Sequence, residues 1–574
     1  MHQRRVRRHR LLRPFTAWLV ACVAPTASGE PGTGRGPEPA TGSDQPTWLE
    51  AEGWLDDVPQ APAQGLAPAA EPDLQAAVRR VLETASARTV ALHLADGTGS
   101  GVWVRGPWIL TARHVVGSPT PGRTRRLTVY FPDGGIAAAT TVPVSEWPAE
   151  PHPELSWLRL LGERAAPEPL VVAPEAPAAG SWVLAMGHPG GYQAQRPIAS
   201  RLGRVEAPAK RAHAGQIQST APLLPGDSGG PLFDLEGRVV GIHSRVGGTA
   251  LTNFHVDTTR ALQGMTQVQG PARPAVPEPP QLPASASAAV ASVEVDGRPV
   301  ALATRVAPGR FVMPAGALPA EADLLLLRLA RRADAEDRRA LVARVEHLDR
   351  RAGLATLVAP VERTDDLPPA SVFDAAADAD TAAGTGPGDL LVSAGPGPTP
   401  LAVSLASTAP VRVPSGAVLG VVLAHAQQEA TVRSVAAGHA LRRGDTVIGW
   451  AGRPLRGRDA LEAAVAAALP GDAVLLDVVD AAGTRRQVEV VLREGQTLTR
   501  HAERVSAASG RVSRRRSGFE RAVIHDAVLP PHRCGGPVYG SDGRFRGINL
   551  ARVDRTTTLL LPTDALATWL SRLP

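Results

Sequence analysis

Two residues that lie far apart in the sequence most constrain how this chain can fold. One is a serine in a glycine-rich segment, and the other is a histidine that follows a strand-like run much earlier in the chain. The serine is Ser228, within LPGDSGGPL, and the histidine is His114, within ILTARHVV. A serine hydroxyl is a weak nucleophile unless a neighbouring base accepts its proton. If these residues act together, the fold must bring two distant segments to one site.

The segments around both motifs have the pattern of a β protein. Short apolar runs, among them TVALHLA, SWVLAMG and RVVGIHS, alternate with turn residues, and glycine (57) and proline (54) are abundant. Short strands at regular spacing favour a sandwich or a barrel. A short helical pattern is expected near residues 75–86.

The glycines beside Ser228 allow a tight turn of the backbone. Such a turn can direct the N–H groups of Gly226 and Ser228 toward one point, where they would form an oxyanion hole. His114 is the candidate base for the Ser228 hydroxyl.

These residues resemble the trypsin-like serine proteases, a family of double β-barrels, and within it the HtrA/DegP-like branch. The histidine motif, the turn AMGHPGG, the strand IQSTA and the serine motif GDSGGPLFDLEGRVVGI occur in the order of that branch. The resemblance covers residues 75–266. It implies a serine endopeptidase that acts on protein or peptide substrates through an acyl-enzyme and needs no cofactor.

The third catalytic position departs from the resembling family. The family has an aspartate before an apolar strand, and the matching stretch ELSWLRL has Glu154 instead. A glutamate has the same charge and can accept the Nδ1–H of His114, which fixes the histidine tautomer. Two alternatives stay open. In one, Glu154 is an ordinary surface residue and the triad is crippled, and in the other Glu150 takes the role.

The specificity pocket of the resembling family implies walls from residues 221–223 and 243–245. The first segment, Ala-Pro-Leu, has no acid that could pair a basic side chain, so a preference for small or medium apolar P1 residues is expected. The remaining histidines of this domain lack the spacing of a zinc site, so no metal is predicted.

A weaker copy of the same pattern recurs in residues 287–414 and 495–574. Gly316 stands at the histidine position, Gly353 at the acid position and Cys534 at the serine position. A thiolate could replace a serine oxygen, but it would still need a base. We interpret this half as a degenerate protease-like domain that serves structure or binding.

Residues 415–494 interrupt the second copy. The run Leu419-Gly420-Val421 resembles the carboxylate-binding loop of PDZ domains, and LRRGDTVI follows it. Such a module takes up a peptide as an extra strand and holds its terminal carboxylate with loop N–H groups. The resemblance implies peptide C-termini as partners, with a closed groove as the alternative. The expected fold class is therefore mainly β, with a trypsin-like double barrel, a degenerate double barrel and an inserted PDZ-like domain.

Residues 1–29 have the pattern of an export signal, because the cationic start HQRRVRRHR precedes a short apolar run. Leu-Val-Ala-Cys resembles a bacterial lipobox and implies a lipid anchor at Cys22, and ordinary cleavage near residue 28 is the alternative. The expected location is the periplasm or the cell envelope, with membrane contact only through that anchor.

Proline-rich composition predicts linkers at residues 30–74 and 267–286, and the basic run RVSRRRS at 511–517 is expected to be a solvated hinge. The net charge is +6, and nearly all of the cationic side chains are arginine, a bias that indicates genome composition. Because basic residues form no stripe interleaved with aromatics, no nucleic-acid partner is expected.

Overall fold

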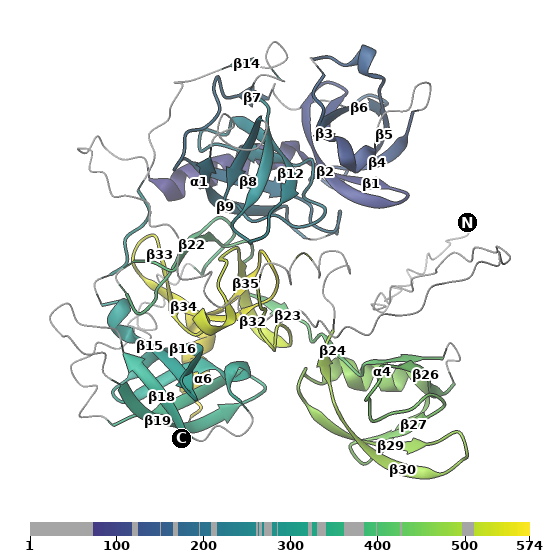
Figure 1. Cartoon of the computed structure of the whole chain (residues 1–574), viewed down its shortest axis with the longest axis vertical. Coiled ribbons are helices and arrows are strands. Elements are labelled where there is room, and N and C mark those ends of the chain that lie inside the picture. Colours follow the sequence, from purple (N-terminus) through teal and green to yellow (C-terminus); the bar gives the residue numbers. More distant parts are fainter. Residues whose placement is uncertain are drawn as a thin grey trace, which may run out of the picture. The chain divides into compact units, whose positions relative to one another are not determined.

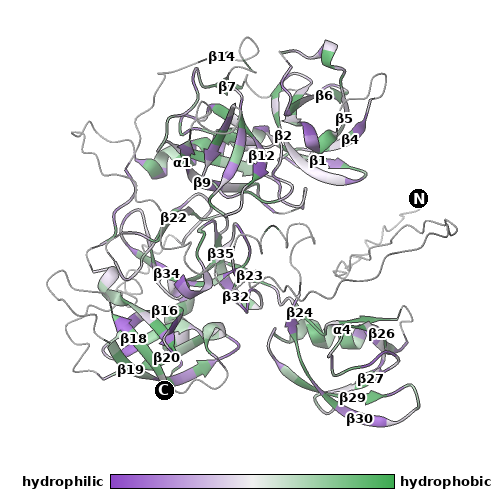
Figure 2. Cartoon of the chain, viewed as in Figure 1, coloured by the Kyte–Doolittle hydropathy of each residue, from purple (hydrophilic) through white to green (hydrophobic). Residues whose placement is uncertain are grey.

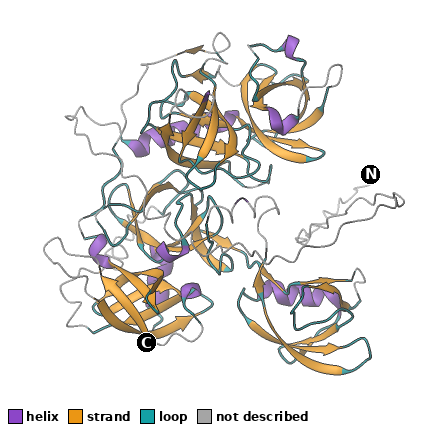
Figure 3. Cartoon of the chain, viewed as in Figure 1, coloured by secondary structure: helices purple, strands orange, loops and turns teal. Residues whose placement is uncertain are grey.

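The structure is a computed structural model, and strands dominate its architecture, as Figure 3 shows. The expectations for the leader and the first linker, including Cys22, and the alternative acid Glu150 lie outside the described residues. The structure describes residues 73–117, 124–149, 151–164, 170–194, 196–207, 215–259, 262, 267–268, 278–283, 285–319, 324–329, 340–360, 384–397, 399–424, 428–495, 505 and 510–573.

The first structural unit is a closed six-stranded barrel (Figure 1). Its interior holds Val90, Leu92, Ile109 and Leu158, all without solvent exposure. The strands are, in order around the barrel, β1 (Thr89–Leu94), β2 (Gly97–Arg105), β3 (Trp108–Ala112), β6 (Leu155–Leu161), β5 (Ile136–Thr141) and β4 (Arg126–Tyr130).

The second unit is an eight-stranded sheet in which β11 pairs with both β8 and β12, so that the sheet closes on itself. The strand β14 pairs with β7 and lies inside the linker predicted at 267–286, so the domain extends two residues past the predicted boundary. The strands are β7 (Val171–Val172), β8 (Trp182–Gly187), β9 (Ala199–Ala207), β10 (Gln216–Ser219), β11 (Pro231–Phe233), β12 (Val239–Val246), β13 (Asn253–Asp257) and β14 (Gln267–Val268).

The helix α1 (Leu74–Ala85) confirms the helical pattern expected near residues 75–86. Asp73 caps its N-terminus by accepting the N–H of Gln75, as an aspartate at this position commonly does. Its apolar face, including Val78 and Val81, is buried in the core of the second unit.

A third unit repeats the strand order of the first barrel. Its core is built from Val293, Phe311, Leu327 and Leu357, which are fully buried. The strands are, in order around the barrel, β15 (Val290–Val295), β16 (Arg298–Ala307), β17 (Arg310–Pro314), β20 (Leu354–Val358), β19 (Ala340–Asp349) and β18 (Leu324–Leu329).

The fourth unit is a seven-stranded sheet, and the helix α6 (Thr563–Leu570) follows the last of its strands along the chain. A single bridge between Ala406 and His525 brings two distant parts of this sheet together, so it curls toward a barrel. The strands are, in order, β22 (Ala402–Leu405), β21 (Leu390–Ser393), β33 (Pro537–Gly540), β34 (Phe545–Arg552), β35 (Thr558–Pro562), β32 (Phe519–His525) and β23 (Val411–Val413).

Between β23 and β32 the chain forms a further unit with its own buried core, which includes Leu461 and Leu476. Figure 2 shows hydrophobic residues on its helix as well as on its strands. Its elements are β24 (Ala417–Val418), β25 (Val421–Leu423), β26 (Ala430–Val435), β27 (Thr446–Trp450), β28 (Arg453–Pro454), α4 (Gly457–Ala467), β29 (Ala473–Val479), β30 (Arg485–Val491) and β31 (Arg493–Glu494).

The basic run at 511–517 is not the solvated hinge that was expected. Ser517 is 3% exposed, and the Arg515 guanidinium donates to the carbonyls of Arg350 and Arg351 and lies over the Phe519 ring. Gly353 has no side chain, and a Cβ there would lie 3.2 Å from Arg515 Nη1. Arg515 therefore packs into space that a larger residue at 353 would fill.

The described residues contain no helix with the length and apolar character needed to cross a membrane.

Candidate active site

His114 lies in the single turn α2 (Arg113–Val116), directly after β3. Pairing of β3 with β6 sets Ala112 opposite Leu155, and the Arg113 N–H donates to the Glu154 carbonyl at 2.8 Å. The register of two barrel strands therefore brings the backbone of the predicted acid beside the turn that carries the predicted base.

Ser228 lies in a glycine turn between β10 and β11, and this turn packs against β3. Gly229 has φ +87°, and a Cβ at this position would lie 2.1 Å from Thr111 Oγ1. Only a glycine fits this conformation and this approach. The serine turn thus contacts the strand that ends just before His114.

Ser100 connects the serine turn to the first barrel, a role that the sequence analysis missed. Its N–H donates to the Ser228 carbonyl at 2.8 Å, and its Oγ–H donates to the Gly226 carbonyl at 2.8 Å. Its own carbonyl accepts the Thr111 hydroxyl at 2.7 Å. The signal in the sequence is a single hydroxyl between the two glycines of Gly-Ser-Gly, where only the turn had been noted.

The carbonyls of Pro225 and Asp227 show which way the N–H groups of Gly226 and Ser228 point, because each carbonyl shares a peptide bond with one of these N–H groups. Gly190 donates to the Pro225 carbonyl at 3.0 Å, and Gly230 donates to the Asp227 carbonyl at 2.9 Å. In a trans peptide the N–H points opposite to the C=O. The N–H groups of Gly226 and Ser228 therefore point away from those partners, and within the described residues neither donates to a backbone carbonyl. Two donors thus remain available beside the serine.

Asp227, the residue before the nucleophile candidate, is fully buried and paired with Arg201 at 2.7 Å. Its carboxylate also accepts the Leu224 N–H at 2.7 Å. Burial raises the pKa of Asp227, and the neighbouring Arg201 opposes this rise. The pair anchors the serine turn to β9.

The Glu154 side chain is exposed, and its Oε2 accepts the Ser244 hydroxyl across 3.5 Å, which is a long contact. Burial lowers the pKa of His114, and the negative charge of Glu154 acts in the opposite direction. Glu154 is therefore close enough to His114 to favour its protonated form. In the described part of the chain, no hydrogen bond links the His114 ring to Ser228 or to Glu154. Ser244 is a second residue of the site that the sequence did not single out for this contact.

The predicted pocket walls carry a buried chain of neutral polar groups. His243 Nδ1 lies 2.9 Å from His255 Nδ1, and His255 Nε2 lies 2.7 Å from Ser219 Oγ. Burial lowers the pKa of His255 to about 3 and that of His243 well below its usual value. Both rings are therefore neutral near pH 7.

Cys534, at the serine position of the second copy, is 2% exposed. Burial raises the pKa of its thiol to about 12, so the thiolate that would be needed as a nucleophile is scarce at neutral pH. Gly316 and Gly353 provide neither a base nor an acid.

The predicted peptide-binding residues surround the start of an edge strand. Leu419 and Gly420 form the turn between β24 and β25, and Val421 is the first residue of β25. β25 pairs with β26 and stands at the end of its sheet. His439 Nε2 lies 2.9 Å from the Leu419 carbonyl.

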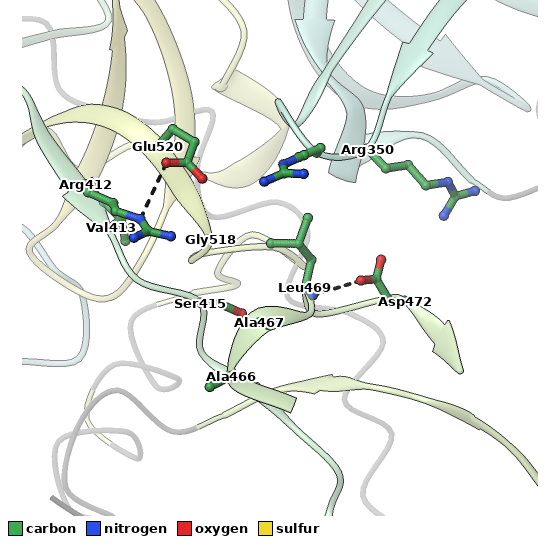
Figure 4. Close-up of a pocket in the computed structure, with 11 residues that line it drawn as sticks. Arg350, Arg412, Val413, Ser415, Ala466, Ala467, Leu469, Asp472, Gly518 and Glu520 are labelled. Atoms are coloured by element: carbon green, nitrogen blue, oxygen red, sulfur yellow. Dashed lines mark hydrogen bonds and ion pairs between the residues drawn. The ribbon is translucent and has the colours of Figure 1, made fainter. Parts of the chain in front are cut away.

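A cavity of about 340 Å³ lies away from His114 and Ser228 (Figure 4). Figure 4 shows the Arg412–Glu520 ion pair on its wall, and the lining mixes basic and acidic side chains without a nucleophile–base pair. Within the described residues, no cluster of three or more His, Cys, Asp or Glu side chains is placed to hold a metal ion.

Comparison with known proteins finds similarity in the segment that contains His114 and Ser228. Residues 98–242 match the model of the trypsin-like peptidase domain family. The chain is 40% identical over 96 residues to a probable periplasmic serine endoprotease DegP-like of Hahella chejuensis, and 30% identical over 182 residues to the protein so named in Ectopseudomonas mendocina. These matches cover 16% and 30% of this chain, and they span only 20% and 36% of the two relatives.

A solved serine endoprotease from Yersinia pestis overlays 75% of this chain and 100% of its own, at 14% identity. The TM-score is 0.27, too low a value to bear on the argument.

Proposed function

Because residues 98–242 form a trypsin-like peptidase domain similar to that of DegP-like proteases, we propose that this chain is a serine endopeptidase. The observation that carries the proposal is the packing of the Ser228 turn on the strand that leads to His114. Gly229, Thr111 and Ser100 make this contact through the approach and hydrogen bonds described above. Two segments far apart in the chain thereby reach one site.

In this proposal the His114 imidazole removes the proton of the Ser228 hydroxyl as the oxygen attacks the substrate carbonyl carbon. The same proton passes to the leaving amine when the peptide C–N bond breaks. Water then attacks the acyl-enzyme, again with His114 as base, and the Ser228 hydroxyl is restored. The first step requires neutral His114, which the lowered pKa of this residue favours at neutral pH.

The N–H groups of Gly226 and Ser228 are proposed to stabilise the negative oxygen that develops on the substrate carbonyl. The support is the orientation of these two peptide groups. Their carbonyls, those of Pro225 and Asp227, accept the N–H groups of Gly190 and Gly230, so the N–H groups of Gly226 and Ser228 point the other way. Donors that are fixed before the reaction stabilise developing charge without reorganisation.

Glu154 is proposed to orient His114 and to stabilise its imidazolium form. Its charge acts on His114, and Ser244 contacts its carboxylate. The side chain is exposed, so water screens its effect more than it would screen a buried aspartate.

The test is labelling with a fluorophosphonate probe, which reacts with an activated serine. Wild-type protein is expected to become labelled, and Ser228→Ala is expected to remain unlabelled. Folded wild-type protein that stays unlabelled would support the alternative, a catalytically inactive scaffold that binds peptides.

The preference at P1 is proposed to be for small or medium apolar side chains. The candidate wall residues Ala221, Leu223 and His243 are buried, and His243 is neutral. A series of chromogenic peptides that differ only at P1 tests this, and faster cleavage after lysine or glutamate than after alanine or valine would contradict it.

Residues 415–494 are proposed to be a PDZ-like module that binds peptide C-termini along β25. The support is that β25 is an edge strand, with Val422 54% exposed. Fluorescence anisotropy with one peptide in free-acid and amidated forms tests the mode, because only the free acid offers a carboxylate to the turn at Leu419 and Gly420. Equal affinity for both forms would contradict it.

Export to the periplasm or cell envelope is proposed from the leader pattern and from the periplasmic relatives. Fractionation of cells that produce the full chain tests the location, and Cys22→Ser tests the lipid anchor.

A further inference from the structure

A buried arginine of the fourth unit, Arg555, donates hydrogen bonds to residues of the trypsin-like domain. Arg555 is 1% exposed, and its Nη2 donates to the Thr252 carbonyl at 3.2 Å and to Asn253 Oδ1 at 3.1 Å. It also donates to the Thr249 carbonyl. These acceptors lie in the connection between β12 and β13 and at the start of β13. A buried guanidinium is costly unless its donors are satisfied, so the residues at 249–253 form part of its binding site.

The acceptor Asn253 also fixes the candidate pocket wall. It is fully buried, and its Oδ1 accepts the Leu223 N–H at 3.2 Å as well as the Arg555 donor. Its amide donates to the Ala250 carbonyl at 2.9 Å, which sets its orientation. One carboxamide therefore joins Arg555 to the segment that leads into the Ser228 turn.

A second connection passes through the buried carboxylate of Asp526. One oxygen accepts the Leu405 N–H in its own unit, and the other accepts the Leu202 N–H of β9 at 2.6 Å. Leu202 is not among the β9 residues that pair with β10, which are Val205 and Ala207. Its N–H is donated to Asp526 instead. The adjacent residue is Arg201, the partner of Asp227.

Apolar packing surrounds these polar contacts. Leu390 and Leu405 belong to the same buried cluster as Leu184 and Leu202 of the trypsin-like domain. β22 packs against β9, and Gln75 of α1 accepts the Leu390 N–H at 2.6 Å. The contact between the two units therefore has an apolar part as well as buried hydrogen bonds.

We infer that the fourth unit is a fixed part of the peptidase, with Arg555 and Asp526 as positioning residues for the two segments that form the site. Arg555 acts through Asn253 on the pocket wall at Leu223. Asp526 acts through β9 and the Arg201–Asp227 pair on the Ser228 turn. The inference rests on the proposed peptidase function.

The variants are Arg555→Met and Asp526→Asn in the full chain. The matched controls are Arg521→Met and Asp564→Asn, whose side chains form an exposed ion pair in the same unit. Assays use a short chromogenic peptide at pH 8, above the pKa of about 7 that burial gives Asp526, so that its carboxylate is ionised.

Arg555→Met is expected to raise KM about tenfold and to flatten the preference among P1 residues, because Asn253, which holds the pocket wall at Leu223, loses its charged hydrogen bond from Arg555. Asp526→Asn is expected to lower kcat and the rate of fluorophosphonate labelling about tenfold, with a smaller effect on KM. Both controls are expected to match the wild type. Lower thermal stability with unchanged kcat, KM and labelling rate would show a merely structural role and overturn the inference.

Hydrogen–deuterium exchange in the Ser228→Ala background separates this inference from the proposed function. Arg555→Met is expected to accelerate exchange in residues 221–228 relative to Arg521→Met. Unchanged exchange there overturns the positioning inference whether or not the wild type is active. Absence of labelling in the wild type overturns the peptidase proposal, while the exchange result still decides the positioning.

Discussion

The two barrel pairs of this chain have the same backbone arrangement around sites with different side chains. In the first pair, Arg113 donates to the Glu154 carbonyl at 2.8 Å, and in the second pair Ala315 donates to the Gly353 carbonyl at 2.9 Å. Residues 114 and 316 directly follow these donors. By strand register, His114 of the first pair and Gly316 of the second pair therefore occupy equivalent positions.

The serine turns correspond in the same way. The Ser228 carbonyl accepts the Ser100 N–H, and the Cys534 carbonyl accepts the Leu302 N–H, both at 2.8 Å. The following glycines have φ +87° and +100°. The turn therefore occurs in both barrel pairs, even where no histidine or acid stands beside it, which indicates that the glycine turn contributes to barrel packing.

The empty base and acid positions of the second pair are not open space. Arg515 lies beside both, because a Cβ at Gly316 would lie 3.3 Å from the Arg515 Cβ and one at Gly353 would lie 3.2 Å from Arg515 Nη1. A Cβ at Gly353 would also meet Phe519 Cε1 at 2.8 Å. In the second pair, side chains from the segment after the inserted unit therefore occupy the space beside Gly316 and Gly353. A side chain at position 353 would clash with Phe519, and one at position 316 would require Arg515 to shift by a few tenths of an ångström.

The strongest test of the comparison makes the first site resemble the second. His114→Gly is expected to lower kcat/KM by at least about 10⁴-fold, because the serine loses its base. Peptide hydrolysis and fluorophosphonate labelling measure the loss. The reciprocal change Gly316→His, in the Ser228→Ala background, is expected to produce no activity, and measurable hydrolysis there would contradict the proposed difference.

The acid position gives the next largest effect. Glu154→Gln is expected to reduce kcat about 10²- to 10⁴-fold, since it removes the negative charge that is proposed to orient His114 and to stabilise its imidazolium form. Glu154 raises the pKa of His114, so its neutralisation lowers that pKa. His114 must be neutral to act as base, and the acid limb of the rate–pH profile should therefore move to lower pH. An unchanged limb and kcat would exclude Glu154 from the triad.

The filled site of the second pair should contribute to stability alone. Arg515→Ala is expected to cost about 1–3 kcal/mol in the free energy of unfolding, because it removes hydrogen bonds to backbone carbonyls and the contact with Phe519. Chemical denaturation measures this loss, with exposed Arg514→Ala as the control. The rate of fluorophosphonate labelling at Ser228 should be unchanged. A changed labelling rate would show that Arg515 affects the first site and would contradict the expectation that it contributes to stability alone.

The smallest effect is expected at the cysteine. In a chain with Cys22→Ser, native Cys534 should resist iodoacetamide at pH 8, because its thiol is buried and has a pKa of about 12. Mass spectrometry should detect alkylation only after denaturation. Rapid alkylation of the native protein would show a reactive thiol.

Much of the backbone could be predicted because local patterns determine it. The β runs, the helix near residue 75 and the equivalence of 114 with 316 and of 154 with 353 follow from strand spacing and turn glycines. Glycine turns and apolar alternation are short-range signals that need no knowledge of distant contacts.

The parts that could not be predicted depend on distant partners. Arg515 lies in a basic run that reads as solvated, but it packs beside Gly353 and over the Phe519 ring, two contacts with residues outside that run. Arg555 meets Asn253 through contacts between units that no local pattern encodes. The hydroxyls of Ser100 and Ser244 likewise acquire their roles only when two barrels meet.

The inserted unit leaves and re-enters the second barrel pair at nearly the same point. Gly495 donates to the Gly416 carbonyl at 2.7 Å, and the Gly416 N–H donates to Ser517 Oγ at 2.7 Å. An insertion with adjoining ends adds little closure entropy to its host. A short bridge that joins residue 416 to residue 495 would therefore excise the inserted unit and leave Arg515 in place, which makes this unit an exchangeable part that could be replaced by another domain without rebuilding the barrels.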